Sequence, residues 1–462
     1  MGKLFGTDGV RGAANTVLTP ELAFDLGRAG SYILAKEAED ERPRILVGKD
    51  TRISGDMLEA ALTAGICASG ADVLTVGVIP TPAVAYLTKL YNASCGVVIS
   101  ASHNPVQDNG IKFFGPNGYK LPDDLENGIE KAVLTGAGGL PRAKGDEVGR
   151  VYEVYEAYNN YVAYLLNCYE GEKDLVDFCV VLDCGNGAAY QAAPAVWKQL
   201  GAKVIVINGS PNGININHRC GSTNTEGLRR AVLSNKADLG IAFDGDADRC
   251  IVVDELGNEL DGDIIMLICA LDMHRRGILT PATVVATVMS NIGLDIALRR
   301  EGIQVVNCAV GDRYVLEKMQ ETEAKLGGEQ SGHIIFGDYA TTGDGVLTSI
   351  KTAEVLRRNK MKISALAGEM EKKPQLLVNV KTGSKSDILE HERLRAVLKE
   401  AEMKLGEWGK LVVRTSGTEP LIRLMAQGEN QMLLEEIIEN IKNALEAAQN
   451  EDASEVTYQA QE

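Results

Sequence analysis

The stretch Ile45-Leu46-Val47-Gly48-Lys49-Asp50-Thr51-Arg52 decides the fold class, because an apolar, β-branched run passes directly into a polar turn. An alanine-rich segment near 56–69 with helical character follows, and 73–76 forms a second short apolar run. A strand, a polar loop, a helix and a strand at this spacing are typical of α/β units with parallel or mixed sheets. The same rhythm returns at 179–207 and at 283–307. We therefore predict three similar mixed α/β domains.

A different order of elements begins near residue 375. The pattern predicts a strand, a helix, two strands around 414–417 and a final helix near 431–447, which is typical of a smaller α+β domain. The polar and acidic residues from Asn450 onward predict a disordered tail. The predicted domains cover residues 1–155, 156–259, 260–374 and 375–449, with 450–462 as the tail.

The composition, with 45% hydrophobic and 24% charged residues, is typical of a soluble globular protein. The apolar run 264–271 is too short to span a membrane, and the N-terminus has no apolar signal segment. A formal charge of −17 argues against a nucleic-acid partner but not against a small anionic substrate, because salt screens charges beyond about 8 Å. The nine cysteines form no C-x-x-C pair, which favours free thiols in a reducing compartment. We predict a cytoplasmic protein without a membrane partner.

The first candidate site is Ser100-Ala101-Ser102-His103-Asn104-Pro105, directly after the apolar run 96–99. A serine at the end of a strand, beside histidine and asparagine, is well placed to be an exposed nucleophile. The same residues also suit an Asn-Pro turn whose hydroxyls cap the backbone. This motif alone leaves both interpretations open.

The second candidate is Asp244-Gly245-Asp246-Ala247-Asp248-Arg249, which follows the apolar run 239–243. Three carboxylates at alternate positions repel one another unless a cation lies among them. Mg²⁺ commonly combines carboxylates with phosphate oxygens, so we predict a magnesium site here, with Arg249 near the same phosphate. A solvated acidic turn is the alternative.

Two further loops suit a sugar phosphate. Gly328-Glu329-Gln330-Ser331-Gly332-His333 presents polar side chains between glycines, as a site for sugar hydroxyls requires. Arg414-Thr415-Ser416-Gly417-Thr418-Glu419-Pro420, with Arg423 on the next strand, combines backbone N–H groups and two guanidinium groups that can bind a phosphate. Taken singly, each loop fits an ordinary turn equally well.

In this order, the four loops resemble the phosphoserine, metal, sugar and phosphate-binding loops of the α-D-phosphohexomutase superfamily, whose four domains surround a central cleft. The chain is similar to the bacterial phosphoglucosamine mutase branch over nearly its whole length, apart from the tail. Ala247 departs from the glycine that many relatives carry. The segments of closest resemblance are Phe5–Gly12, Asp108–Phe114, Asn215–Asn217, Cys220–Thr223, Val310–Val315 and Thr341–Gly345.

The resemblance implies an isomerase that interconverts glucosamine 6-phosphate and glucosamine 1-phosphate, for the synthesis of UDP-N-acetylglucosamine. The phosphoryl group would pass through phosphorylated Ser102 and a 1,6-bisphosphate intermediate. One Mg²⁺ per chain would be held by Asp244, Asp246, Asp248 and the phosphate on Ser102. The sugar phosphate is the expected partner, and a homodimer is the candidate assembly.

The resemblance also assigns roles to individual residues. Lys112, Arg11 and His333 are candidates for proton transfer, and His103 would support Ser102. A lysine acts as a base only if surrounding cations or desolvation lower its pKa. The residues expected to bind substrate are Glu329, Ser331, Arg249, Arg414, Ser416, Gly417, Thr418 and Arg423.

Other functions stay open at this point. A phosphomannomutase/phosphoglucomutase would carry the same loops but act on a different sugar. A sugar-phosphate phosphatase or bisphosphate synthase would exchange the phosphoserine with water or with a donor. A non-catalytic sensor is disfavoured, because a sensor does not need a phosphoryl acceptor such as Ser102.

Overall fold

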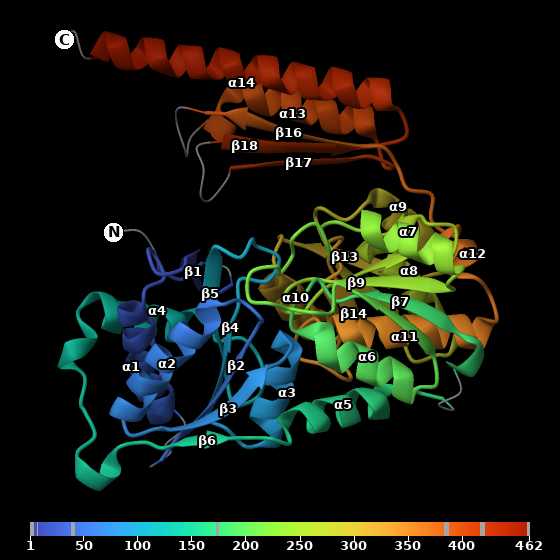
Figure 1. The fold of residues 1–462 in the computed structure, drawn as a ribbon. Coiled ribbons are helices and arrows are strands. Elements are labelled where there is room, and N and C mark those ends of the chain that lie inside the picture. Colours follow the sequence, from blue (N-terminus) through green and yellow to red (C-terminus); the bar gives the residue numbers. More distant parts are fainter. Residues whose placement is uncertain are drawn as a thin grey trace.

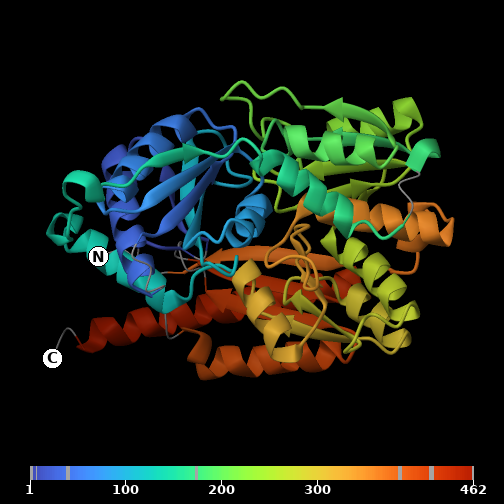
Figure 2. The ribbon, with the colours of Figure 1, turned by 90° about the horizontal axis from the view of Figure 1, so that it is seen from below.

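The computed structural model of the chain describes residues 4–6, 8–37, 42–171, 175–382, 388–415 and 421–459. Four sheets lie within these residues, and each has helices beside it. Figure 1 shows the N-terminal domain beside the second and third domains, with the C-terminal domain above them, and Figure 2 shows the same arrangement from below. The predicted fold class is confirmed. No helix in these ranges combines the length and apolar character that crossing a bilayer requires.

Domain I is built on a mixed six-stranded sheet in the order β1-β5-β4-β2-β3-β6. The predicted strands at 45–48 and 73–76 both form, because most of their apolar side chains are buried in the core. The strands are β1 (Val10–Ala13), β2 (Arg44–Lys49), β3 (Asp72–Val78), β4 (Cys95–Ile99), β5 (Asp108–Phe114) and β6 (Val151–Glu153). The helices are α1 (Pro20–Glu37), α2 (Ser54–Ala68), α3 (Thr81–Leu90) and α4 (Asp123–Leu134).

Domain II has a five-stranded sheet in the order β11-β10-β9-β7-β8. The aspartate-rich loop is the turn between the antiparallel strands β9 and β10. The strands are β7 (Cys179–Asp183), β8 (Lys203–Ile207), β9 (Leu239–Phe243), β10 (Cys250–Val253) and β11 (Glu259–Leu260). The helices are α5 (Ala157–Cys168), α6 (Ala189–Gln199) and α7 (Glu226–Asn235).

Domain III has a four-stranded sheet in the order β13-β12-β14-β15. The predicted sugar-binding loop connects the antiparallel strands β14 and β15. The strands are β12 (Thr283–Thr287), β13 (Gln304–Cys308), β14 (Leu326–Gly328) and β15 (Ile334–Phe336). The helices are α8 (Gly262–Arg275), α9 (Ile292–Arg300), α10 (Asp312–Thr322), α11 (Gly345–Asn359) and α12 (Ile363–Ala367).

Domain IV is a smaller antiparallel sheet in the order β16-β18-β17, covered by two helices. The expected end of its last helix differs from the structure. Instead of stopping near 447 and giving way to a tail at 450, α14 continues to Gln459, because this segment contains neither glycine nor proline to end a helix. The elements are β16 (Gln375–Lys381), α13 (Glu392–Leu405), β17 (Lys410–Thr415), β18 (Leu421–Gln427) and α14 (Gln431–Gln459).

The hydrophobic core is divided unequally among the domains. One cluster of buried side chains runs through domains II and III and extends to Val98 and Phe114 of domain I. Within it, Trp197 Nε1 of α6 donates a hydrogen bond to Ser349 Oγ of α11 at 3.1 Å. Domain IV is built around a separate cluster that includes Leu424. The fourth domain therefore has its own core.

Candidate active site

Loops from three domains meet at one point. Ser102 follows β4, the aspartate-rich loop joins β9 to β10, and His333 precedes β15. Ser102 Oγ lies 2.6 Å from Asp244 Oδ2, and His333 Nδ1 lies 3.7 Å from Asp248 Oδ2. The backbones of Arg249 and His333 also form an isolated β-bridge. The first three predicted loops therefore form one site.

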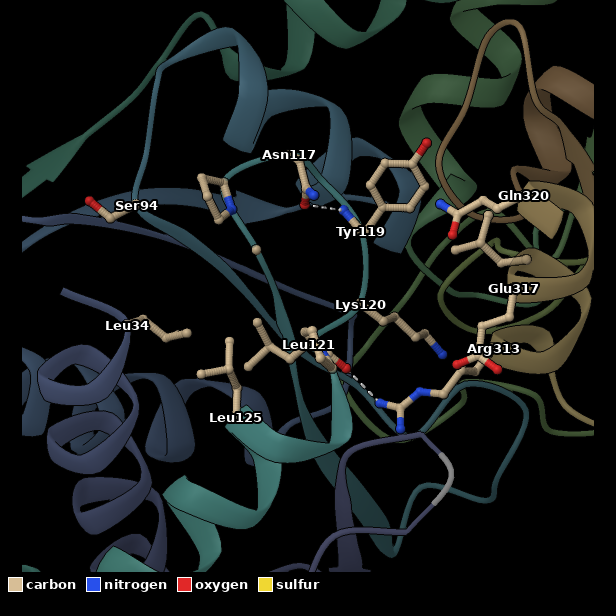
Figure 3. A pocket seen from close by; sticks show the side chains of 14 residues that line it. Leu34, Ser94, Asn117, Tyr119, Lys120, Leu121, Leu125, Arg313, Glu317 and Gln320 are labelled. Atoms are coloured by element: carbon tan, nitrogen blue, oxygen red, sulfur yellow. Dashed lines mark hydrogen bonds between the residues drawn. The ribbon is translucent and has the colours of Figure 1, made fainter. Parts of the chain in front are cut away.

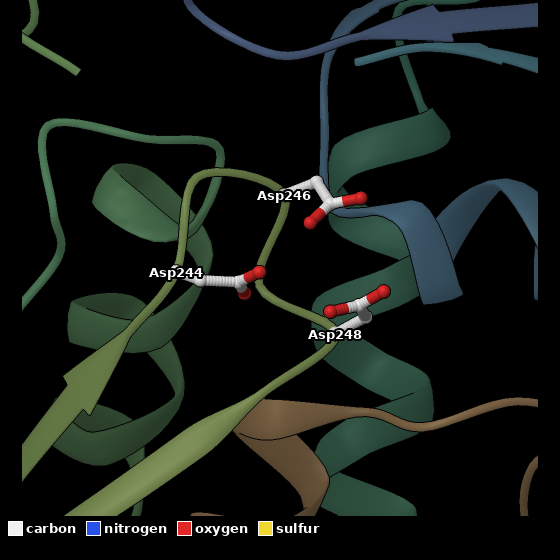
Figure 4. Close-up of side chains that lie close together, drawn as sticks. All are labelled: Asp244, Asp246 and Asp248. Carbon is white, nitrogen blue, oxygen red and sulfur yellow. The ribbon is translucent and has the colours of Figure 1, made fainter. Parts of the chain in front are cut away.

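Three aspartates of domain II form a buried cluster of carboxylates (Figure 4). One oxygen of each lies within 4.8 Å of the others. Burial, together with the charges of Asp248 and Asp246, raises the pKa of Asp244 well above its ordinary value. Oδ1 of Asp246 and Oδ1 of Asp248 are buried and have no hydrogen-bond partner among the described residues, which is costly without a compensating charge. This donor set fits a hard divalent cation.

Ser102 lies closer to the aspartates than its position at the end of a strand suggested. We expected an exposed hydroxyl, but only 1% of the residue is exposed, because the aspartate-rich loop lies against it. Its Oγ donates a hydrogen bond to Asp244 and lies 3.3 Å from His103 Nδ1. Its φ of 51° is left-handed, which is uncommon for a residue other than glycine.

Lys112 and Arg11 supply positive charge beside the aspartates. Lys112 Nζ lies 2.9 Å from Asp8 Oδ2 and 3.0 Å from Asp246 Oδ2, and Arg11 forms an ion pair with Asp8. Burial disfavours the charged lysine, but the charges of Asp246 and Asp8 outweigh burial and raise the pKa of Lys112 above its ordinary value. These neighbours therefore do not give Lys112 the lowered pKa that it would need to act as a base.

His103 is held as a neutral imidazole beside Ser102. Burial, followed by the charges of Arg249 and Arg11, lowers the pKa of His103 to about 4. Its Nδ1 lies 3.2 Å from Arg249 Nη1 and accepts a hydrogen bond, because a guanidinium group can only donate. The backbone N–H of Arg249 donates to Asp244 Oδ1 at 3.2 Å.

Both ring nitrogens of His333 face protein groups. The backbone N–H of Gly343 donates to Nε2 at 3.0 Å, so the neutral ring carries its proton on Nδ1, which faces Asp248. Burial lowers the pKa of His333, but the Asp248 carboxylate, 3.7 Å from Nδ1, outweighs burial and raises it. This histidine therefore places a ring nitrogen beside one of the three aspartates.

A row of alternating charges extends the site across domains I and III, and the sequence predicted no role for Asp8, Lys120 or Asp312 in it. Lys120, in the loop before α4, forms ion pairs with Asp8 and with Asp312 at the start of α10. Asp312 Oδ2 lies 3.9 Å from His333 Nε2. Asp8 and Asp312 belong to segments that carried the family resemblance, but nothing in those segments indicates that Lys120 joins them.

Apart from Arg249, which lies beside the aspartates, the predicted substrate-binding residues belong to domains III and IV. In domain III, Glu329 Oε1 accepts a hydrogen bond from the backbone N–H of Gly311 at 3.0 Å, and Ser331 is exposed. In domain IV, Arg414 of β17 lies opposite Arg423 of β18, and burial and then the Arg423 charge lower the pKa of Arg414. The predicted contributors Ser416, Gly417 and Thr418 lie outside the described residues.

A cavity of about 480 Å³ lies between domain I and α10 (Figure 3). Leu34, Leu121, Leu125 and Leu316 form much of its apolar lining, and Lys120 lines it as well. Its lining includes neither Ser102 nor the three aspartates. The cavity therefore borders the row of charges but is separate from the site itself.

The phosphoglucomutase/phosphomannomutase family models match four consecutive parts of the chain. Alpha/beta/alpha domain I matches residues 2–137, domain II matches 156–257, domain III matches 261–373, and the C-terminal domain matches 377–444. Together these matches cover most of the sequence.

Curated relatives and solved structures agree with the family models. The chain is 69% identical to a phosphoglucosamine mutase of Syntrophomonas wolfei, over 97% of this chain and 100% of that protein. It is 53% identical to the phosphoglucosamine mutase of Pelotomaculum thermopropionicum, over 96% and 99%. A phosphoglucomutase/phosphomannomutase family protein from Burkholderia thailandensis superposes with a TM-score of 0.80 at 25% identity, over 96% and 97%. The fold is also that of an Aspergillus fumigatus N-acetylphosphoglucosamine mutase solved with GlcNAc-6P and magnesium, with a TM-score of 0.68 at 17% identity, over 96% of each chain.

Proposed function

The chain belongs to the phosphoglucosamine mutase branch of the phosphoglucomutase/phosphomannomutase family, and we propose that it interconverts glucosamine 6-phosphate and glucosamine 1-phosphate through a phosphoryl group carried on Ser102. The observation that supports this role most directly is the contact of 2.6 Å between Ser102 Oγ and Asp244 Oδ2. This contact places the Ser102 hydroxyl, from domain I, next to a cluster of three carboxylates from domain II. A sugar-phosphate substrate fits the mutase family.

We propose Mg²⁺ as the resident metal, held by Asp244, Asp246, Asp248 and an oxygen of the Ser102 phosphate. When bound, the ion would polarise the phosphoryl group and offset its negative charge. A phosphoserine carries about −1.5 to −2 charges at neutral pH. Without a cation, this charge would lie beside three buried carboxylates, so the charge of the site itself argues for the metal.

In the first step, the bond between phosphorus and Ser102 Oγ breaks, and a bond forms between phosphorus and the C1 hydroxyl oxygen of glucosamine 6-phosphate. That hydroxyl loses a proton and Oγ gains one. We propose that Lys112, Arg11 and His333 handle these protons. Lys112 starts the step protonated, because Asp246 and Asp8 keep it charged, so it can donate a proton but not accept one, while His333 lies beside Asp248.

The second step reverses these roles. The sugar 1,6-bisphosphate turns so that its 6-phosphate faces Ser102, which receives the phosphoryl group back and leaves glucosamine 1-phosphate. We propose that Arg249, Arg414, Arg423 and the loop at 416–418 bind phosphate, while Glu329 and Ser331 bind sugar hydroxyls. The separate core of domain IV is consistent with a domain that opens while the intermediate turns.

We further propose that the protein works in the cytoplasm as a homodimer and supplies UDP-N-acetylglucosamine synthesis. The nine free cysteines support a reducing compartment. Light scattering of the purified protein tests the assembly, with the dimer mass expected and the monomer mass contradicting it.

One experiment separates this function from its alternatives. The purified protein is assayed in parallel with glucosamine, glucose and mannose 6-phosphates, while release of inorganic phosphate is followed. We expect isomerisation fastest with glucosamine 6-phosphate and no stoichiometric phosphate release. Faster turnover of mannose or glucose 6-phosphate would indicate the alternative mutase, and phosphate release without isomerisation would indicate a phosphatase.

A further inference from the structure

Arg52 directs both terminal nitrogens of its guanidinium group at the segment that carries Ser102. This side chain is fully buried, and Nε donates to Asp50 Oδ2 at 2.8 Å. The four remaining N–H groups donate to backbone carbonyls of the loop after β4 and of the first residue of β5. Those acceptors are Ser102 at 2.9 Å, Asn104 at 2.8 Å, Pro105, and Asp108 at 3.0 Å. An arginine has five N–H donors in a fixed plane, and all five are used here.

Two of these carbonyls receive a second hydrogen bond from domain II. Asn217 Nδ2 donates to the Ser102 carbonyl at 2.9 Å and to the Asn104 carbonyl at 3.1 Å. A carbonyl oxygen has two lone pairs, so both carbonyls are fully satisfied by Arg52 and Asn217 together. The carbonyl oxygens of Ser102 and Asn104 are therefore each bound by a side chain of their own domain and by a side chain of the neighbouring domain.

The aspartate-rich loop lies against the same atoms. A Cβ added at Gly245 would lie 2.5 Å from the Ser102 carbonyl oxygen and 2.9 Å from Asn217 Nδ2. Only a glycine allows this close approach. The carbonyl of Ser102 is thus the point at which the Asp50–Arg52 turn, the Asn217 loop and the aspartate-rich loop converge.

The backbone of Ser102 needs such support. A residue other than glycine at φ 51° is held there only when its surroundings impose the conformation. Ser100 Oγ contributes from the other side, because it donates to Asp50 Oδ2 at 2.6 Å and accepts from the Ser102 N–H at 3.0 Å. Arg52 therefore binds the Ser102 carbonyl directly, and Asp50 supports the Ser102 N–H through Ser100.

We propose that Arg52 and Asn217 are positioning residues for the phosphoryl carrier: they hold the Ser102 carbonyl so that the left-handed backbone directs Oγ at the three aspartates. This inference rests on the proposed role of Ser102 and adds to it, since neither side chain needs to touch the substrate. A shift of about 1 Å in a reacting group lowers a rate about 100-fold. The loss should fall on kcat, because the sugar and phosphate contacts lie elsewhere.

The test compares two buried arginines of domain I. Arg52→Lys keeps the charge but loses the planar set of donors, whereas Arg28→Lys makes the same change on α1, where Arg28 is equally buried and Nη2 donates to the Leu140 carbonyl. A second pair is Asn217→Asp, which replaces both donor hydrogens, and Asn235→Asp at an exposed site on α7. For each variant kcat, KM for glucosamine 6-phosphate, the thermal midpoint and the ³¹P resonance of the phosphorylated protein are measured.

We expect Arg52→Lys and Asn217→Asp to lower kcat about 100-fold, leave KM within about twofold, and shift the ³¹P resonance, while both control variants behave like the parent protein. Normal kcat and an unshifted resonance in a folded Arg52→Lys protein would overturn the inference. The inference would also be overturned if the loss of kcat only followed the drop in thermal midpoint and appeared equally in Arg28→Lys. If the parent protein itself has no mutase activity, the proposed function fails instead.

Discussion

The hydroxyl of Ser102 and the carboxylate of Asp244 are 2.6 Å apart, although they are separated by 142 positions and belong to different domains. A hydroxyl alone needs only one acceptor, but here it faces three carboxylates, two of which have buried oxygens without a hydrogen-bond partner among the described residues. Such an arrangement is unfavourable for an unmodified serine and suits a phosphorylated one with a cation. The predictions below follow from this relationship and from the charges around it.

Removal of divalent cations should stop turnover. EDTA should silence the enzyme and Mg²⁺ should restore it, because the three aspartates repel one another and the phosphoserine without a cation. Mg²⁺ at 100 times its dissociation constant should also stabilise the protein by about 2.7 kcal/mol. Calorimetry with and without Mg²⁺ measures this, and Asp246→Asn should remove most of the shift. Activity that persists after exhaustive chelation would contradict the metal site.

Arg414→Ala should weaken substrate binding more than it slows chemistry. A charge-assisted hydrogen bond contributes about 1.5–3 kcal/mol, so KM for glucosamine 6-phosphate should rise about 10- to 100-fold. Lys404→Ala on α13 is the matched control, because it removes a positive charge from the same domain but from a pair with Glu436. An unchanged KM in Arg414→Ala would show that this arginine does not bind the substrate phosphate.

Lys120→Met should destabilise the junction of domains I and III. The substitution removes the cation that pairs with the partly buried Asp312, so the loss should stay below the roughly 3–5 kcal/mol that breaking a fully buried pair costs. Adding Asp312→Asn should recover part of the loss. Urea unfolding measures both, with Lys325→Met as control, since its pair with Asp338 is exposed and contributes about 0–1 kcal/mol. A double variant no more stable than Lys120→Met would argue against this ion pair.

Asp263 of α8 should make the protein less stable as the pH rises. Burial, and then the charge of Asp261, raises the pKa of Asp263 to about 7. Below a pH of about 4, folded and unfolded chains both bind this proton, whereas between about 4 and 7 only the folded chain keeps it. The stability that this bound proton gives the folded protein is therefore lost as the pH rises from about 4 through 7. The thermal midpoint of Asp263→Asn, relative to the parent protein, should increase between pH 5 and pH 8. A constant difference would show that Asp263 does not titrate in this range.

Local patterns predicted the elements, and contacts between distant residues decided the rest. The runs at 45–48 and 239–243 became β2 and β9, because a strand with apolar residues buried on both faces is encoded locally. The burial of Ser102 could not be foreseen, since a loop from another domain covers it. The same holds for the charged state of Lys112 and the partners of Lys120, which depend on side chains more than 100 positions away.

The central claim is that Ser102 carries the phosphoryl group. Intact mass and peptide mapping of the purified protein, before and after phosphatase treatment and then after incubation with a glucose 1,6-bisphosphate donor, test it most directly, with glucosamine 6-phosphate turnover measured at each stage. We expect one phosphate on Ser102, its loss together with activity on phosphatase treatment, the return of both with the donor, and neither in Ser102→Ala. Full turnover by protein that carries no phosphate at residue 102, or by Ser102→Ala, would contradict the account.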